Sequence, residues 1–467
     1  MTIKQSIMVK PSKKTPQKTI HISKLDMVIR APNTHTNVFY VYDHPPPSKS
    51  PPSFNAEILK NALSEILVPY YPLAGRLRLN QNRDRYEINC NAMGVLFVEA
   101  ETNLTLKDLN DFEPSASLRE LLIPDCDYTR DLSLIPLFML QVTWFKCGGL
   151  GLGFAAHHHI ADGSANTYFI AKLLKMVAGL DYFVTPVHDR IHVAPRDPLC
   201  IKFQHLHEFD PIVPSLPLNG FIKGEQNYDT KQCLFKLSKQ QIQVLKQATL
   251  SQAMKYAANN NHKISTFAIL ASHIWRSACN ARDIPYDQEV KLYVPVDGRS
   301  RLKDPVIPEV YYGNVLFFSI CIAKAGDIIH QPIWYTARKI QESIEKMDDE
   351  YLRSSIDNLE QRQGVPAPLM GAHKIMYPDL MINSWVKLPF YKADFGWGPP
   401  KVVGNCEIKL EGLSFLMGGS KEDEGLTLAI NLFSVHMPMF KKHLYTFMPM
   451  PMFKKHLYTF MPISSSL

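Results

Sequence analysis

The chain has 467 residues, of which 46% are hydrophobic and 20% charged, and its formal net charge at pH 7 is +7. This composition is typical of a globular protein and excludes a disordered or fibrous chain, and the length predicts roughly two or three domain-sized cores. The basic residues are spread along the sequence without a long run. We therefore expect no nucleic-acid partner, although a modest positive field would suit a small anionic partner.

Neither the cysteines nor the apolar segments indicate a secreted or membrane protein. The 8 cysteines are scattered and form no Cys-x-x-Cys pair, which argues against a zinc knuckle or a disulfide framework and favours reduced thiols. The N-terminal residues carry lysines without an apolar core, unlike a secretory signal. No apolar run approaches the ~20 residues that a membrane span needs. We expect a cytoplasmic protein.

Residues 1–197 predict a first domain of mixed strands and helices. Residues 54–68 place their apolar side chains on one helical face, and Ser53 is the expected cap of this helix. A proline- and serine-rich loop precedes it at 43–53. Strands are expected at 3–11, 19–29, 38–42, 76–79, 85–90 and 139–145.

The composition changes at residues 198–224, where prolines are frequent and few apolar residues recur with a regular period. This stretch predicts a crossover linker to a second domain at 225–449. Mixed strands and helices in both halves, without strict βαβ alternation, predict an α/β fold of the mixed α+β kind. In the second half we expect strands at 232–236, 290–296 and 314–323 and helices at 238–248, 265–280 and 333–346.

The C-terminal end contains a tandem duplication. Residues 437–449 recur identically at 450–462. A solenoid needs more and longer repeats than this, so we expect the first copy to finish the last helix. The second copy, within residues 450–467, is expected to be a disordered extra tail.

A histidine-rich turn is the strongest candidate for chemistry. The glycine-rich apolar run 149–156 predicts a buried strand, three histidines follow at 157–159, and residues 164–178 have helical spacing. A histidine at the end of a buried strand suits a general base, because its pKa lies near neutrality. His157 and His159 are expected to face away from His158. From these residues alone, a satisfied core histidine is an equal alternative.

Three motifs together resemble one enzyme family. They are His-x-x-x-Asp-Gly at 158–163, Tyr-Pro-Leu-Ala-Gly-Arg at 71–76 and Asp-Phe-Gly-Trp-Gly at 394–398. In this order and spacing they resemble the plant BAHD acyl-CoA-dependent acyltransferases, over about residues 8–447. Within this family, the sequence most resembles the hydroxycinnamoyl-CoA shikimate/quinate hydroxycinnamoyltransferase branch. The stretches that carry this finer likeness are 8–11, 140–149, 312–315, 349–354 and 384–389.

The resemblance implies two chloramphenicol-acetyltransferase-like sandwich domains with an active-site channel between them. It implies an enzyme of plant phenylpropanoid metabolism that moves a hydroxycinnamoyl group from CoA to a hydroxyl or amine acceptor. Acyl-CoA would be a co-substrate, with no permanently bound cofactor and no metal. His158 matches the family's catalytic histidine. We expect a cytoplasmic monomer whose partners are small-molecule substrates.

The resemblance also assigns structural roles near the site. Asp162 could orient the histidine as in a catalytic triad, but in the family this carboxylate points away and pairs with an arginine, for which Arg299 is the candidate. Gly163, just before the expected helix at 164–178, is also expected to be structural. Asp394, Gly396, Trp397 and Gly398 are likewise expected to be structural residues near the site.

The acceptor pocket departs from the family pattern. The arginine that grips the acceptor carboxylate in the shikimate and quinate enzymes is replaced by Met370, and a thioether cannot replace a guanidinium. The other expected pocket residues are Thr36, Val38, Tyr40 and Asn383. Lys374 or Lys387 could supply a substitute charge. We therefore expect poor use of shikimate and an alternative acceptor, either a polyamine or a neutral alcohol.

Two rival interpretations remain. A condensation domain of a peptide assembly line shares the His-His-x-x-x-Asp-Gly spacing, but it lacks the other two motifs. An inactive paralogue acting as a binding protein is the alternative from another class, motivated by the altered pocket and the duplicated tail. CoA-dependent turnover with any acceptor would exclude the paralogue.

Overall fold

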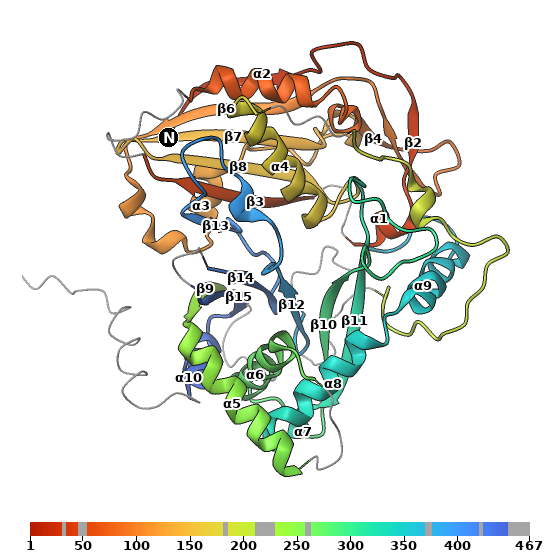
Figure 1. Cartoon of the computed structure of the whole chain (residues 1–467), viewed down its shortest axis with the longest axis vertical. Helices are drawn as coiled ribbons and strands as arrows, with labels where there is room; N and C mark the ends of the chain where they lie inside the picture. The colour runs from red at the N-terminus through yellow and green to blue at the C-terminus, as the bar shows by residue number, and fades with distance from the viewer. Residues whose placement is uncertain are drawn as a thin grey trace, which may run out of the picture.

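The structure is a computed structural model. It describes residues 1–29, 34–44, 54–180, 185–210, 229–256, 263–368, 376–419 and 424–446. Within these residues no helix is long and apolar enough to cross a membrane. Two six-stranded sheets dominate the molecule, one in the upper half of Figure 1 and one in the lower half.

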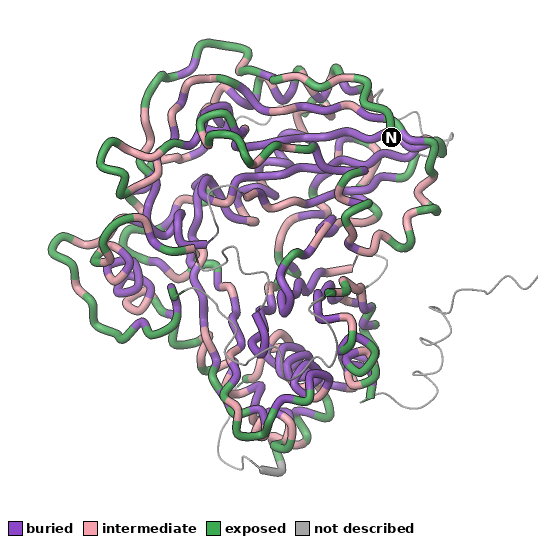
Figure 2. Tube along the Cα trace, turned by 180° about the vertical axis from the view of Figure 1, so that it is seen from behind, coloured by how far each residue is buried: buried purple, intermediate pink, exposed green. Residues whose placement is uncertain are grey.

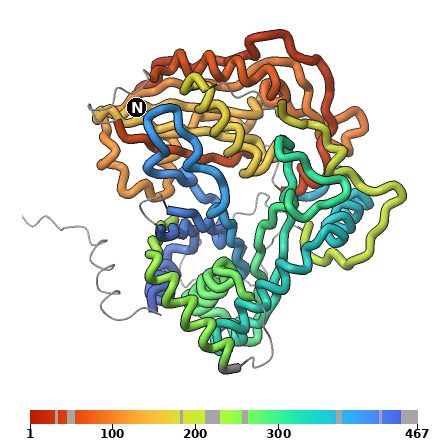
Figure 3. The backbone as a smooth tube through the Cα atoms, viewed as in Figure 1, coloured from red at the N-terminus to blue at the C-terminus, as the bar shows by residue number. Residues whose placement is uncertain are grey.

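The first sheet carries the histidine turn. Its order is β1 (Thr2–Val9), β6 (Val95–Thr102), β7 (Phe138–Phe145), β8 (Leu150–His157), β3 (His35–Tyr42) and β13 (Val402–Gly404). Strand β13 comes from the far end of the chain and pairs antiparallel with β3. Figure 3 shows this blue segment rising beside the red-to-yellow strands.

Both faces of this sheet are covered. Helices α2 (Ala56–Ile66) and α4 (Gly163–Val177) pack together over one face, and α3 (Ala116–Leu122) contacts β7 and β8. The glycines of β8 have a steric cause, because a Cβ on Gly153 would lie 1.8 Å from the Leu122 carbonyl oxygen. The close backbone approach expected for the glycine-rich run is confirmed. Figure 2 shows the strands of this sheet largely buried.

The second sheet has the order β11 (Leu316–Lys324), β10 (Glu289–Asp297), β12 (Leu380–Ser384), β14 (Leu413–Gly418), β15 (Leu426–Phe433) and β9 (Thr230–Leu237). The mostly buried helix α6 (Thr266–Ala281) contacts α8 (Ile333–Glu345) and α10 (Met437–Tyr445). Helices α5 (Lys239–Tyr256) and α7 (Ala325–His330) complete this layer. A small third sheet joins β2 (Thr19–His21), β5 (Tyr86–Asn89) and β4 (Arg76–Leu79).

Two expectations near the N-terminus are wrong. The strand expected at 19–29 is only β2, and α1 (Lys24–Val28) follows it, because Ser23 and Asp26 form a capping box that starts a helix. The cap of α2 is Asn55, whose side chain accepts a hydrogen bond from the Ile58 N–H. Ser53, the expected cap, lies outside the described residues.

The expected linker starts as an irregular segment that is hydrogen-bonded to α9 (Asp349–Gln361), a helix that the periodicity analysis missed. Residues 198–210 contain neither helix nor strand, and 211–224 lie outside the described residues. Arg196, just before this segment, donates to Asp357 of α9 at 2.7 Å, and the Cys200 N–H donates to the same carboxylate. The expected domain boundaries stay a prediction.

The first copy of the tandem repeat forms α10. Its buried side chains include Phe440 and Leu444, both fully covered by the body of the protein. The expectation that this copy forms the last helix is confirmed for the residues described. The second copy at 450–462 lies outside them, so its expected disorder stays a prediction.

Candidate active site

His158 lies at the junction of a strand and a helix. Strand β8 ends at His157, residues 158–160 form a turn, and α4 begins at Gly163. Asp162 caps this helix, because its Oδ1 atom accepts a hydrogen bond from the Ala165 N–H at 3.1 Å. The strand–turn–helix arrangement expected from the sequence is confirmed.

The two neighbouring histidines are buried on the other side of the turn. His159 is 1% exposed, its Nε2 atom lies 3.2 Å from the Met27 carbonyl oxygen, and its ring stacks on Tyr86. His157, also 1% exposed, packs edge-on against His35. Burial lowers the pKa of His35 to about 3, so this neighbour is neutral. Neither flanking histidine lines the cavity that His158 faces, as expected.

A cavity beside His158 is walled by both halves of the chain. Its polar lining includes Thr36, Asn166 and Thr167, and its apolar wall includes Trp385. The Thr36 Oγ1 atom is buried and has no hydrogen-bond partner among the described residues. None of the residues described in this lining is a lysine or an arginine. The full lining is Thr36, Val38, Phe154, His158, Ala161, Asp162, Gly163, Asn166, Thr167, Trp385, Leu388 and Phe390.

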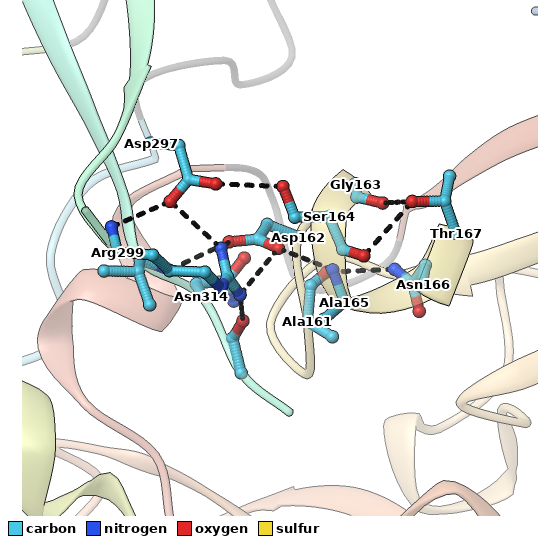
Figure 4. A network of polar contacts seen from close by, with 12 residues as sticks. Ala161, Asp162, Gly163, Ser164, Ala165, Asn166, Thr167, Asp297, Arg299 and Asn314 are labelled. Carbon is cyan, nitrogen blue, oxygen red and sulfur yellow. Dashed lines mark hydrogen bonds and ion pairs between the residues drawn. The ribbon is translucent and has the colours of Figure 1, made fainter. Parts of the chain in front are cut away.

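Asp162 binds Arg299 through two parallel hydrogen bonds (Figure 4). The Arg299 Nη1 and Nη2 atoms donate to the two carboxylate oxygens at 2.8 and 3.0 Å, and the Val315 N–H adds a third donor at 2.9 Å. Burial opposes ionisation of Asp162, but Arg299 and the backbone donors outweigh it, so the pKa of Asp162 is lowered. The expected Arg299 pairing is confirmed.

This geometry favours a structural role for Asp162 over a triad role. Its carboxylate is 3% exposed and already accepts hydrogen bonds from Arg299, Val315 and Ala165. Arg299 also donates to the Gly313 carbonyl and to Asp297. The pair therefore joins the start of α4 to the segments that flank β10 and β11 in the second sheet.

The residues expected in the acceptor pocket are only partly brought together. Thr36 and Val38 line the cavity, but Tyr40 does not, because its ring is 0% exposed and lies between Phe154 and Phe390. Asn383 lies on β12 and is absent from the described lining. Lys387 is exposed and is also absent from that lining. Met370 and Lys374 lie outside the described residues.

The Asp-Phe-Gly-Trp-Gly loop is not beside His158, contrary to its expected place near the site. Asp394 accepts hydrogen bonds from the Gly396 and Gly398 N–H groups, and Trp397 packs near Phe54. Phe395 of the same loop contacts Tyr42, at the opposite end of β3 from His35. Seven strand steps of about 3.3 Å separate these ends by roughly 23 Å. The loop's described contacts are packing contacts that lead into β13.

Sequence reasoning missed several residues around His158. The cavity wall formed by Trp385 and Leu388 comes from the stretch 384–389, which carried part of the family likeness but received no role. Asn314, whose Nδ2 atom donates to the His158 carbonyl oxygen at 2.8 Å, was also part of such a stretch. Motif position alone does not reveal these contacts, because more than a hundred residues separate the partners.

Most of the chain is similar in sequence to known proteins. The Transferase family matches residues 1–447. An anthranilate N-benzoyltransferase of Dianthus caryophyllus is 45% identical, and a shikimate O-hydroxycinnamoyltransferase of Nicotiana tabacum is 43% identical. Each alignment covers 95% of this chain and 99% of the relative.

Solved structures share the fold at lower identity. Vinorine synthase superposes with a TM-score of 0.70 at 21% identity, covering 95% of this chain and 98% of that one. F. sporotrichioides TRI101 complexed with coenzyme A and T-2 gives 0.72 at 17% identity, covering 94% and 98%. These likenesses establish the two-domain, chloramphenicol-acetyltransferase-like fold. The family match over residues 1–447 and the relatives at 45% and 43% identity show that the chain belongs to the Transferase family of BAHD acyl-CoA-dependent acyltransferases.

Proposed function

We propose that the chain transfers an aromatic acyl group, hydroxycinnamoyl or benzoyl, from CoA to a hydroxyl or amine acceptor, with His158 as the general base. The observation that carries the proposal is the position of His158, which faces a cavity walled by both halves of the chain. The flanking histidines are buried elsewhere, so His158 is the histidine of the turn available to a substrate.

The reaction requires a general base on the protein, and it does not require a nucleophilic side chain. A thioester is already activated, whereas an alcohol is barely ionised at neutral pH. His158 accepts the acceptor's proton as the oxygen attacks the thioester carbon, and the tetrahedral intermediate then expels the CoA thiolate. An amine attacks as the neutral nitrogen, and the base removes a proton from the resulting ammonium. General base catalysis of this kind contributes typically about 10²–10⁴-fold.

The acyl group is proposed to be aromatic. The described cavity wall includes Phe154, Trp385 and Phe390, which can pack against a planar ring. The names of the similar proteins include benzoyl and hydroxycinnamoyl transfer. A hydroxycinnamoyl donor would fit the phenylpropanoid role implied by the sequence, and benzoyl is the alternative donor.

For the acceptor, we propose an amine or a neutral alcohol in preference to shikimate or quinate. The described lining contains no cationic side chain to pair with a carboxylate, and the position of the expected arginine is occupied by Met370. A buried carboxylate without a partner is costly. Thr36 lines the cavity and its hydroxyl has no hydrogen-bond partner among the described residues, which supports a polar contact with such an acceptor. The likeness to an anthranilate N-benzoyltransferase supports an amine as the attacking group, but because anthranilate also carries a carboxylate, we favour an amine without one.

An acceptor screen tests the proposal. Purified protein is given p-coumaroyl-CoA or benzoyl-CoA with anthranilate, spermidine, a neutral phenolic alcohol, shikimate or quinate, and release of the CoA thiol is followed with a thiol-reactive dye. We expect an acceptor without a carboxylate, spermidine or the neutral alcohol, to be the best acceptor, and Met370→Arg to improve use of shikimate. Shikimate as the best acceptor, with no gain from Met370→Arg, would contradict the acceptor assignment. Absence of turnover with every pair would favour the binding-protein alternative.

We further propose that the protein works as a cytoplasmic monomer with these small molecules as its partners and no permanently bound cofactor. The single-chain cavity supports this proposal, since residues of one chain supply both walls. Light scattering of the purified protein with and without acyl-CoA tests the monomer. A stable dimer in both conditions would contradict it.

A further inference from the structure

Three buried polar residues meet behind the histidine turn. Asp26 lies on α1, Arg190 begins the short 3-10 helix η5 (Arg190–Val193), and Asn314 precedes β11. Asp26 and Asn314 are both 0% exposed, and Arg190 is 9% exposed. We call these three residues the Asp26 cluster. None of them lines the cavity beside His158.

The Asp26 carboxylate organises the other two members. Its Oδ2 atom accepts a hydrogen bond from the Arg190 Nε atom at 3.1 Å, and its Oδ1 atom accepts one from the Asn314 Nδ2 atom at 2.8 Å. The Ser23 N–H and hydroxyl also donate to Oδ2. The carboxylate, which is itself 0% exposed, therefore fixes both an arginine and an amide in a buried site, where such bonds are strong.

Both fixed groups hold the turn that carries His158. The Asn314 Nδ2 atom also donates to the His158 carbonyl oxygen at 2.8 Å, so its two hydrogens join Asp26 to the histidine's own backbone. The Arg190 Nη2 atom donates to the Ile160 carbonyl oxygen at 2.8 Å. The cluster thus binds the backbone of the first and last residues of the turn 158–160 through side chains that do not line the cavity.

We propose that Asn314, held by Asp26, is a positioning residue that fixes the backbone of His158 and so aims its imidazole into the cavity. This inference rests on the proposed role of His158 as the base. The imidazole is attached to the peptide unit that Asn314 binds, and a shift of the turn moves the base relative to the acceptor. A misplacement of about 1 Å can cost about 10²-fold in rate.

The test is a double-mutant cycle between Asn314 and His158, measured as kcat at saturating acyl-CoA and acceptor. Asn314→Ala should lower kcat by about 10–10²-fold and change either KM by less than about threefold. His158→Ala should lower kcat by about 10²-fold or more. If Asn314 acts through His158, the double variant should have the kcat of His158→Ala within about twofold.

A matched control separates positioning from stability. Asn431 is also buried, at 1% exposure, and its Nδ2 atom likewise donates to a backbone carbonyl, that of Ile408, away from the turn. Asn431→Ala should lower the melting temperature about as much as Asn314→Ala does and leave kcat unchanged. Asn314→Ser, which keeps one donor, serves if the alanine variant does not fold, and should show a smaller loss of kcat.

The outcomes are distinct. Full kcat in Asn314→Ala, or in Asn314→Ser if only that variant folds, would overturn the inference while leaving His158 as the base. A double variant slower than His158→Ala by the full Asn314→Ala factor would also overturn it, because Asn314 would then act independently. An active His158→Ala variant would refute the proposed function itself. Non-additive loss with an unaffected Asn431→Ala control would support the inference.

Discussion

The substitution Asp162→Asn decides whether Asp162 joins the two halves of the chain or orients His158. The carboxylate is 3% exposed and accepts two hydrogen bonds from Arg299. An amide cannot accept all of these bonds, and among the described residues Arg299 would keep only Asp297, at 3.2 Å, as its acidic partner. Breaking a buried pair from one side costs about 3–5 kcal/mol. Because the Arg299 side chain is 18% exposed, we expect Asp162→Asn to lower the free energy of unfolding by about 3 kcal/mol, the lower end of this range.

This loss translates into a measurable change in melting temperature. For a domain-sized unit, each kcal/mol lowers the melting temperature by about 2–4 °C, so Asp162→Asn should melt about 6–12 °C below wild type. Asp297→Asn is the control, because that carboxylate is 45% exposed and its pair with Arg299 should contribute about 1 kcal/mol or less. An Asp162→Asn variant with unchanged melting temperature but lost kcat would refute the structural role and favour a triad.

The pH dependence of the same variant gives a second test. Burial opposes ionisation of Asp162, but Arg299 and the backbone donors lower its pKa. A carboxyl with a lowered folded pKa stabilises the fold above its unfolded pKa of about 3.9, and this stability is lost as the pH falls through the folded pKa. The melting-temperature gap between wild type and Asp162→Asn should therefore be constant from about pH 8 to pH 5. A gap that changes near pH 6.5 would indicate a histidine partner.

Three further predictions concern the tail, the buried histidines and the cavity. Truncation after Phe447 should leave melting temperature and kcat near wild type, because the first copy supplies the buried Phe440; insoluble protein would contradict this. Burial lowers the pKa of His35 to about 3 and of His273 to about 4. Below about pH 6.5 the unfolded chain therefore binds more protons than the folded chain, and the melting temperature should fall as the pH is lowered from about 6.5 to about 5. A melting temperature that is constant over this range would contradict the prediction. Thr36→Val should raise the acceptor's KM several-fold without changing that of acyl-CoA, and equal changes in both would contradict the pocket assignment.

Local patterns in the sequence predicted the elements around His158. The glycines of the run 149–156 and the helical spacing of 164–178 are signals within one strand and one helix, and β8 and α4 lie where they were expected. The helix α1 was missed because β-branched residues at 19–29 favour a strand, while its Ser23–Asp26 capping box is a weaker signal. The Arg299 pairing came from the family likeness, since no local pattern connects it to Asp162.

Contacts between distant segments could not be predicted in this way. Thr36, Val38 and Tyr40 share one face of β3 by alternation, but the Tyr40 ring packs between Phe154 and Phe390 and is absent from the cavity lining. The link from Asn314 to Asp26 spans 288 residues. The sequence around Asn314 and the sequence around Asp26 contain no pattern that indicates the other residue. Such contacts depend on how the two sheets face each other, which periodicity does not determine.

The most direct test of the central claim is the kcat of His158→Ala with a CoA thioester and the best acceptor of the screen. If His158 is the base, kcat should fall by about 10²-fold or more, while the melting temperature stays near wild type because the side chain is not fully buried. A variant that folds normally and retains more than about a tenth of wild-type kcat would show that another group removes the acceptor's proton.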